Sequence, residues 1–306
     1  MVIFDLAISF VWEYDKEFVQ LIEKRFQEAR LTTFLIERHN VLEVIEDLKT
    51  KKIFFLALLD RASDEDPEFL PIIKLLSFKK SCIINPHFKV IRSIDKASMH
   101  KRLLKTNFFL PKTILLPSFN KKAGIFIPPR KMDEIGVPFI IKPALTSGGG
   151  LGVINNAVTL QQIEESRRKN IKEKYLIQEK IYPKIILGKR AWFRVFYAFG
   201  TSIPTWWDDL THICNRVTNN EIKKYSLKPL NAISKKLARI TLLDYFSTEI
   251  AFTNDNKFYL IDYINDQCDM RLRTNHRDGV PDDVVIEFID NMKKKVLKIK
   301  NSYHPR

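Results

Sequence analysis

The sequence predicts an α/β protein with a small doubly wound domain at its N-terminus and a larger mixed region after it. Three observations support this. Strand-like and helix-like segments alternate over the first ninety residues. A buried-strand pattern near the middle of the chain ends in a lysine and a glycine-rich loop, and a hairpin pattern near the C-terminus carries carboxylates. The length of 306 residues and the 45% hydrophobic content allow a sizeable core.

The first ninety residues are predicted to form a parallel sheet with helices between its strands. Apolar runs indicate strands at 2–9, 33–36, 53–59 and 82–84. Asp15 is expected to cap the first helix. Asn40 and Glu43 have the spacing of a capping box at the start of the second helix. Such alternation of strands and helices is typical of a doubly wound α/β domain.

A basic helix and a second capped helix are predicted further along the chain. Asp95 is expected to cap the basic helix, which ends before Pro111. Thr159 and Gln162 have capping-box spacing at the start of a helix that runs to about Lys169. The apolar run after this helix, 175–181, predicts a strand.

The stretch from Val137 to Val153 joins a predicted strand to a glycine-rich loop. Val137 to Lys142 is rich in β-branched and aromatic residues, which indicates a buried strand that ends at Lys142. Glycines let a main chain approach a ligand closely, so that backbone N–H groups and an ammonium can bind phosphate oxygens. The alternative is a surface hairpin with a glycine-rich tip. The loop residues with hydroxyls or without side chains are Thr146, Ser147, Gly148, Gly149, Gly150 and Gly152.

The segment 247–262 has the alternating pattern of a β-hairpin. A turn centred on Asp255 and Asn256 places Glu249 directly opposite Asp262. Like charges in that position destabilise a strand pair, whereas a hard divalent cation such as Mg²⁺ between them would stabilise it. The alternative is a bulge that displaces one carboxylate into solvent.

Two further segments contain side chains suited to a site. Arg194 interrupts the apolar strand predicted at 192–199, so it is expected either to be salt-bridged or to face an anion. The stretch 205–212 is predicted to be a mixed aromatic and acidic loop that contains Trp206 and Trp207. It can serve as a packing corner or as a substrate contact.

The composition narrows the class of protein. The net charge of +15 favours an acidic partner. Basic residues are not interleaved with aromatic residues on one element, so nucleic acid is not the expected partner. The lysines at 293–300 fit the solvated face of a terminal helix. No apolar run reaches 18 residues, so we expect no membrane span and a cytoplasmic location. The scattered Cys82, Cys214 and Cys268 indicate neither disulfides nor a zinc site.

The lysine-ended strand with its glycine loop, followed by the carboxylate hairpin, resembles the ATP-grasp superfamily of ATP-dependent carboxylate–amine ligases. The resemblance runs from about Arg92 to the end of the chain. It implies an ATP-grasp fold of two α+β lobes, at 93–178 and 179–306, preceded by an α/β domain at 1–92. It also implies ATP and Mg²⁺ as cofactors, and an anionic small molecule or a peptide as the substrate.

The resemblance assigns roles to individual residues. Lys96 and Lys142 correspond to the two nucleotide lysines, and Thr146 to Gly152 to a mobile lid over the phosphates. The adenine hinge corresponds to Gln178, Glu179, Lys180 and Tyr182. The metal ligands correspond to Glu249, Asp262 and Asn265, with Asp266 as the alternative third ligand because two residues separate Asp262 from Asn265. Arg194 resembles the arginine of the DxR pattern in ribosomal-protein glutamate ligases, with Trp192 in place of the aspartate. Arg271 follows the metal motif closely and is the candidate to bind an anionic group of the substrate; the alternative is that it forms an ordinary salt bridge.

The activity implied by the resemblance is the activation of a carboxylate as an acyl phosphate, which an amine or similar nucleophile then attacks. Two alternatives remain open at this stage. One is a kinase that acts on an anionic, phosphorylated small molecule, which the basic charge would suit. The other is a protein that binds a nucleotide or polyanion without turnover.

Overall fold

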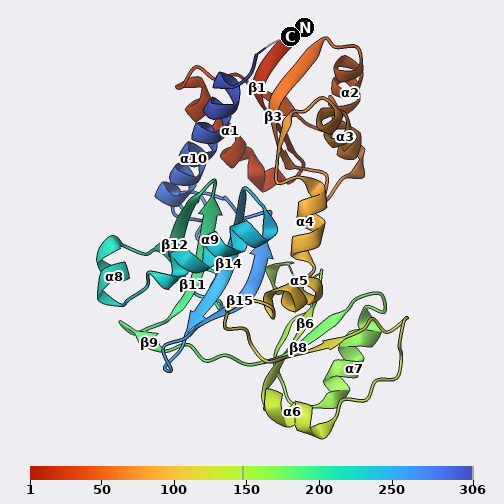
Figure 1. Cartoon of the computed structure of the whole chain (residues 1–306), viewed down its shortest axis with the longest axis vertical. Coiled ribbons are helices and arrows are strands. Elements are labelled where there is room, and N and C mark those ends of the chain that lie inside the picture. Colours follow the sequence, from red (N-terminus) through yellow and green to blue (C-terminus); the bar gives the residue numbers. More distant parts are fainter. Residues whose placement is uncertain (147, 305–306) are drawn as a thin grey trace.

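The computed structural model describes residues 1–146 and 148–304. The N-terminal part is a parallel sheet in the order β2-β1-β3-β4, seen at the top of Figure 1. The doubly wound domain predicted from the sequence is therefore confirmed. Its strands are β1 (Val2–Phe10), β2 (Thr33–Ile36), β3 (Ile53–Arg61) and β4 (Cys82–Ile84). Its helices are η1 (Glu13–Asp15), α1 (Lys16–Gln27), α2 (Val41–Lys49), η2 (Pro67–Phe69) and α3 (Leu70–Phe78).

Two predicted helix caps in this domain are wrong. The carboxylate of Asp15 caps nothing, because both of its oxygens accept hydrogen bonds from Arg61. The side chain of Asn40 accepts from the backbone N–H of Glu37 and donates to the carbonyl of Leu35, so it closes the turn before α2. In both cases a competing partner takes the side chain from the helix terminus.

The second sheet is antiparallel, in the order β13-β12-β11-β14-β15. Helix α9 covers one face and α10 covers the other, where α10 also packs against α1 (Figure 1). Trp206 and Trp207 belong to β12, so the predicted aromatic loop begins only at Asp208. The elements are β11 (Trp192–Ala198), β12 (Thr201–Trp207), β13 (Cys214–Arg216), α8 (Asn219–Lys224), α9 (Pro229–Thr241), β14 (Tyr245–Phe252), β15 (Phe258–Asn265) and α10 (Asp282–Asn301).

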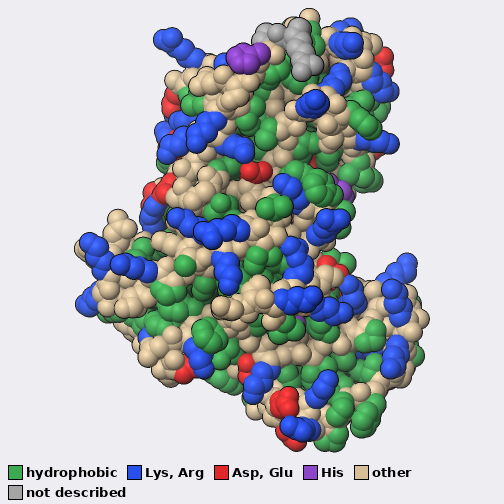
Figure 2. Space-filling view, viewed as in Figure 1, with side chains coloured by type: hydrophobic (Ala, Val, Ile, Leu, Met, Phe, Trp, Pro, Cys, Tyr) green, Lys and Arg blue, Asp and Glu red, His purple; other side chains and the backbone are tan. Residues whose placement is uncertain are grey.

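The third sheet is also antiparallel, in the order β5-β8-β6-β7, and forms a separate lobe at the lower right of Figure 1. Figure 2 shows the surface hollowed where this lobe meets the rest of the molecule. The strand before the glycine loop, predicted over 137–142, spans Phe139–Pro143, and Val137 is exposed outside it. The elements are β5 (Thr113–Leu116), α6 (Pro129–Ile135), β6 (Phe139–Pro143), η3 (Gly148–Gly150), β7 (Ile154–Ala157), α7 (Leu160–Lys169) and β8 (Tyr175–Glu179).

Two short helices and a short strand pair lie between the three larger sheets along the chain. Helices α4 (His87–Ile94) and α5 (Lys96–Leu103) lead from the parallel sheet to the lobe, and β9 (Ile185–Ile186) pairs with β10 (Lys189–Arg190). Asp95 caps α5 as predicted, although this helix ends well before Pro111. The predicted capping box at Thr159 is confirmed. Among residues 1–146 and 148–304, no helix has the length and apolar character needed to cross a membrane.

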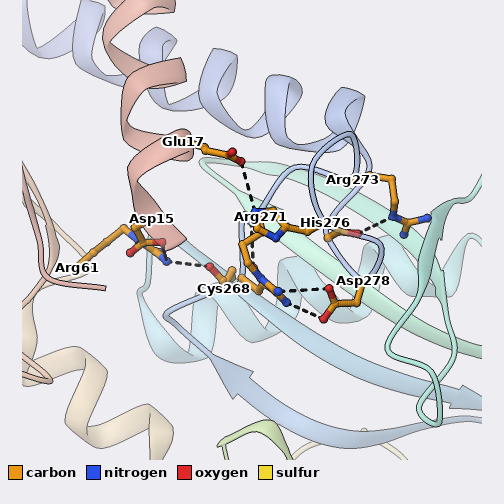
Figure 3. Close-up of polar contacts among 10 residues, drawn as sticks. Asp15, Glu17, Arg61, Cys268, Arg271, Arg273, His276 and Asp278 are labelled. Carbon is orange, nitrogen blue, oxygen red and sulfur yellow. Dashed lines mark hydrogen bonds and ion pairs between the residues drawn. The ribbon is translucent and has the colours of Figure 1, made fainter. Parts of the chain in front are cut away.

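A buried ion pair joins the parallel sheet to the segment after β15 (Figure 3). Arg61, at the end of β3, binds both carboxylate oxygens of Asp15 at 2.7 Å and donates to the carbonyl of Cys268 at 3.1 Å. Arg61 and Asp15 are 5% and 3% exposed. The bidentate pair and the backbone carbonyl together satisfy much of the hydrogen-bonding capacity of the buried guanidinium.

Removing one partner of this pair should destabilise the protein strongly. Arg61→Met leaves Asp15 buried without its counter-ion, so we expect a loss of about 3–5 kcal/mol in the free energy of unfolding. Urea unfolding monitored by circular dichroism measures this loss. The double variant Asp15→Leu/Arg61→Met should recover part of it, and an Arg61→Met variant as stable as the wild type would contradict the account.

Candidate active site

The predicted pairing of Glu249 with Asp262 across β14 and β15 is confirmed, although the turn is not the one expected. Phe252 pairs with Phe258, which centres the turn on Asp255 alone. A bulge between Glu249 and Ile250 then shifts the register by one residue and brings the carboxylates opposite each other. The side chains of Glu249 and Asp262 are 18% and 28% exposed.

Two buried lysines from different segments converge on Asp262. The Nζ atom of Lys142, near the end of β6, lies 3.4 Å from Asp262 Oδ1, and that of Lys96, at the start of α5, lies 3.6 Å from the same oxygen. The backbone N–H of Lys96 donates to the carbonyl of Ala144 at 2.9 Å, which holds α5 beside β6. Lys96 and Lys142 are each only 8% exposed.

This cluster is positively charged. Burial lowers the pKa of the Lys142 ammonium, and Asp262 opposes that effect. Burial alone would raise the pKa of Asp262, but Lys142, Lys96 and Arg194 together lower it, so this carboxyl is ionised at neutral pH. Two ammonium groups therefore share one carboxylate. Asp262 Oδ1 is buried and accepts no hydrogen bond from the residues that the structure describes. The arrangement favours the approach of an anion beside the lysines.

Arg194 is paired with the other carboxylate of the hairpin. Its Nη2 donates to Glu249 Oε1 at 2.7 Å, while Trp192 Nε1 donates to Glu249 Oε2 at 3.1 Å. The guanidinium carbon of Arg194 lies 3.5 Å from the centre of the Trp207 ring, a cation–π contact. Of the two expectations for Arg194, the salt bridge is the one the structure contains. Trp207 thus packs against a residue of the site.

The glycine-rich loop between β6 and β7 is exposed and has the backbone that glycine permits. Gly150 and Gly152 have φ values of 81° and 69°, where other residues are strained. A Cβ atom at Gly152 would also lie 3.1 Å from Pro143 Cγ. Ser147, the second hydroxyl residue of the predicted lid, lies outside the described residues. Neighbouring Thr146 is exposed, but its backbone N–H and its hydroxyl both donate to the carboxylate of Glu173.

The start of this loop is held by Glu173, a residue that the sequence did not single out. Its carboxylate accepts from the backbone N–H groups of Leu145 and Thr146 at 3.3 and 3.2 Å and from the Thr146 hydroxyl at 2.9 Å. Glu173 is 5% exposed. Adjacent Lys174 pairs with Asp95, the cap of α5. No sequence pattern marks Glu173, because it precedes β8 in an irregular turn.

The predicted hinge residues lie at the end of β8, beside the strand that carries Lys142. Gln178 is buried and donates to Thr113 Oγ1 at 3.0 Å and to Tyr263 Oη at 3.4 Å. Glu179 accepts from the backbone N–H of Lys112 at 2.8 Å. Lys180 bonds to the side chain of Asn156, and Tyr182 is 61% exposed. Gln178 is thus linked through Tyr263 to β15, whereas Tyr182 projects into solvent.

The two candidates for a third metal ligand differ in their surroundings. Asn265 ends β15 and is exposed. Asp266 is 9% exposed and lies near Asp64; burial and this neighbour raise its pKa to about 6. Within the described part of the chain, no three His, Cys, Asp or Glu side chains form a metal-binding group. Protein ligands beyond Glu249 and Asp262 would have to be amide or backbone oxygens.

Arg271 does not stand free for a substrate. Its Nη2 lies 2.7 Å from Asp269 Oδ2 and 2.9 Å from Asp278 Oδ2, and the latter pair is drawn in Figure 3. The hydrogen bond to Asp269 is the main cause of the raised pKa of Arg271. Because two carboxylates neutralise this guanidinium, binding an anion there would require at least one of them to leave.

Comparison with known proteins identifies the fold. No family model and no curated protein match the chain. Solved structures do match, and they show that the chain has the ATP-grasp fold. The ATP-grasp ligase PsnB, complexed with a minimal precursor, Mg and ADP, matches with a TM-score of 0.61 and 12% identity, over 94% of this chain and 98% of its own.

Two further matches cover nearly the whole of both chains. Macrocyclase MdnC from Microcystis aeruginosa MRC, bound with precursor peptide MdnA, gives a TM-score of 0.63 at 11% identity, over 97% of this chain and 100% of its own. D-alanine–D-alanine ligase from Bacillus anthracis, complexed with ATP, gives 0.60 at 15% identity, over 99% and 100%. The predicted fold of two lobes preceded by a doubly wound domain is therefore confirmed.

The buried His100 should make stability depend on pH. Its Nδ1 lies 2.6 Å from Tyr263 Oη, and burial lowers its pKa to about 4. In the unfolded chain this histidine binds a proton near the ordinary pKa of 6.5. The contribution of neutral His100 to the free energy of unfolding is therefore complete above pH 6.5. It is lost as the pH falls toward 4, by about 1.4 kcal/mol per pH unit. Urea midpoints measured at pH 7, 6 and 5 should fall less steeply for His100→Gln than for the wild type. His39→Gln, at an exposed position, should follow the wild type.

Removing the Glu173 carboxylate should loosen the start of the glycine loop. Glu173→Ala leaves the N–H groups of Leu145 and Thr146 without their acceptor, so we expect hydrogen exchange at these two residues and across 148–153 to become several-fold faster. Glu165→Ala, at an exposed position on α7, is the matched control and should leave that exchange unchanged. Equal exchange rates in wild type and Glu173→Ala would show that the carboxylate does not hold the loop.

Proposed function

We propose that this protein is an ATP- and Mg²⁺-dependent ligase that activates a substrate carboxylate as an acyl phosphate and transfers the acyl group to an amine or similar nucleophile. The observation that carries the proposal is the convergence of Lys96 and Lys142 on Asp262 of the carboxylate hairpin, with Lys142 on the strand that leads into the glycine loop. A triphosphate needs cations, backbone donors and a metal site together, and this part of the fold supplies groups of each kind.

In this proposal ATP lies between the lobe and the antiparallel sheet that carries β15. Its adenine contacts the end of β8, at Gln178 to Lys180 and Tyr182. Its phosphates lie beneath the glycine loop and beside Lys96 and Lys142. The ligands named in the matched structures, ATP in the D-alanine–D-alanine ligase and Mg with ADP in PsnB, agree with this assignment.

The donor set suits Mg²⁺. Glu249 and Asp262 present carboxylate oxygens from paired positions, and one of them, Asp262 Oδ1, is buried without a hydrogen-bond donor. Mg²⁺ is usually held by one or two carboxylates together with substrate phosphates, and the third protein ligand proposed here is Asn265. When bound, the metal would neutralise negative charge on the phosphates.

The chemistry asked of the chain is charge neutralisation and alignment. A substrate carboxylate oxygen attacks the γ-phosphorus, the bond to ADP breaks, and an acyl phosphate forms. The amine nitrogen then attacks the acyl carbon, phosphate leaves, and the nitrogen loses a proton. Lys142 and Lys96 counter charge on the phosphates, while Arg194 positions Glu249. The glycine loop, when closed, would exclude water from the acyl phosphate.

The substrate class that we infer is an amino acid or a peptide carboxylate. This inference is supported by two of the matched structures, the macrocyclase MdnC bound with precursor peptide MdnA and a D-alanine–D-alanine ligase.

Hydroxylamine trapping tests the reaction class. Incubation with MgATP, hydroxylamine and a panel of amino acids and acidic peptides should give a hydroxamate together with ADP, because hydroxylamine intercepts an acyl phosphate. Glu249→Gln and Asp262→Asn should each lower the rate at least about a hundredfold, as expected when a group that stabilises the transition state is lost. Coupled ADP release and colorimetric hydroxamate detection measure both products.

Asp255→Asn is the control, since Asp255 lies in the exposed turn of the same hairpin and pairs with Lys257. It should keep wild-type rates. ADP release without hydroxamate would favour the kinase alternative, and ATP binding without ADP release across the panel would favour a non-catalytic nucleotide-binding protein. Full activity in the Glu249→Gln/Asp262→Asn double variant would refute the site.

A further inference from the structure

The positive charge of the chain is concentrated in two segments that contain no Asp or Glu. The first, 96–132, holds nine Lys and Arg residues, and the second, 222–243, holds six. The positive charges of the two segments together equal the entire net charge of +15, so the remaining residues have a net charge of zero. Lys96, in the first segment, belongs to the candidate active site.

The fold brings parts of these two segments together on one surface. Arg102, on α5, donates to the carbonyl of Ile240, in α9, at 2.7 Å. Lys236, on α9, lies 4.6 Å from the ring centre of Phe108, just after α5. Lys89, on neighbouring α4, donates to the carbonyl of Leu242 at 3.1 Å. Helices α4, α5 and α9 are thus joined through their basic side chains.

We define the basic face by the cations of these three helices other than Lys96, which pairs with Asp262, together with Lys105 directly after α5. None of them forms an ion pair with a carboxylate in the described part of the chain. Figure 2 shows Lys and Arg gathered across the middle of the molecule, over α9, α4 and α5, with few acidic side chains among them. The basic face consists of Lys89, Arg92, Lys101, Arg102, Lys105, Lys235, Lys236 and Arg239.

Large apolar side chains are exposed on the same helices. Phe88 and Ile91, on α4, are 57% and 51% exposed, and Leu104 and Leu242, at the ends of α5 and α9, are each 62% exposed. Single exposed apolar residues are common, but these lie between unpaired cations. A partner that covers this surface has to supply both negative charge and apolar side chains.

We propose that the basic face binds an acidic peptide segment that also carries apolar residues. A peptide can place carboxylates against the lysines and aliphatic side chains against Ile91, Leu104 and Leu242. Nucleic acid supplies negative charge but no aliphatic side chains. Proteins that bind single strands rely on stacking of bases on aromatic side chains. This inference goes beyond the proposed ligase activity and does not depend on ATP.

Fluorescence anisotropy with the full-length chain tests the proposal. The probe is a labelled 16-residue helical peptide of alternating glutamate and leucine faces, without nucleotide present. We expect saturable binding that weakens as NaCl is raised from 50 to 300 mM, because the charges are exposed and screened. A matched peptide with serine in place of leucine should bind more weakly.

Two variants with equal net charge separate the basic face from the charge of the whole protein. Lys101→Gln/Lys105→Gln/Lys235→Gln/Arg239→Gln should weaken binding about tenfold or more, since loss of several exposed contacts adds up to that factor. The control Lys49→Gln/Lys51→Gln/Lys52→Gln/Lys74→Gln alters exposed lysines on the N-terminal domain and should change binding less than about twofold. Ile91→Ser/Leu104→Ser should weaken the leucine peptide but not the serine peptide.

Several results would overturn the proposal. Equal losses in the two quadruple variants would mean that only the net charge matters. Tighter binding of a 16-nucleotide single strand, or of phosphatidylserine vesicles, through the same cations would assign the face to nucleic acid or to a lipid surface instead. Identical affinity for the leucine and serine peptides would remove the apolar part of the interface. Because the assay contains no ATP, its outcome is separate from that of the hydroxylamine experiment.

Discussion

The carboxylate of Asp262, whose Oδ1 atom is buried, is the group on which the candidate site depends. It lies between the ammonium groups of Lys96 and Lys142, which come from α5 and β6, while Asp262 itself comes from β15. Burial disfavours every one of these charges, so each is tolerated only because the others are present. The same cluster keeps a positive excess at the point where the lobe meets the antiparallel sheet. The negative charge of an anion bound there would neutralise this positive excess.

The surrounding structure holds these segments in place by polar contacts of different kinds. The N–H of Lys96 bonds to the carbonyl of Ala144, and Lys174 bonds to the cap of α5, so the helix and the root of the glycine loop stay together. Arg61 performs a similar task for the segment after β15, which it ties to the N-terminal domain. Beside these contacts, Gly148, Gly149, Gly150 and Gly152 of the loop and Asn265 at the end of β15 remain exposed.

Charge is used differently inside the molecule and on its surface. At the site and at the junction with the N-terminal domain, cations are matched with carboxylates at short range, as in the pairs of Arg194 with Glu249 and of Arg271 with Asp269. On the basic face the cations have no such partners among residues 1–146 and 148–304. Unpaired surface charge contributes little to folding, but it creates a potential that attracts acidic partners over about a Debye length.

The sequence by itself determined the alternating N-terminal domain, the strand that carries Lys142 and the hairpin that opposes Glu249 to Asp262, because apolar periodicity and glycine clusters act over a few neighbouring residues. It missed the bulge that sets the hairpin register, and it placed Trp207 in a loop rather than on β12. Only the tertiary structure decided that Lys96 and Lys142 meet at one carboxylate, that Glu173 holds the loop, and that Asp269 and Asp278 neutralise Arg271. These contacts join residues far apart in the chain, and their geometry follows from how the apolar faces of whole elements pack, which no local pattern of residues records.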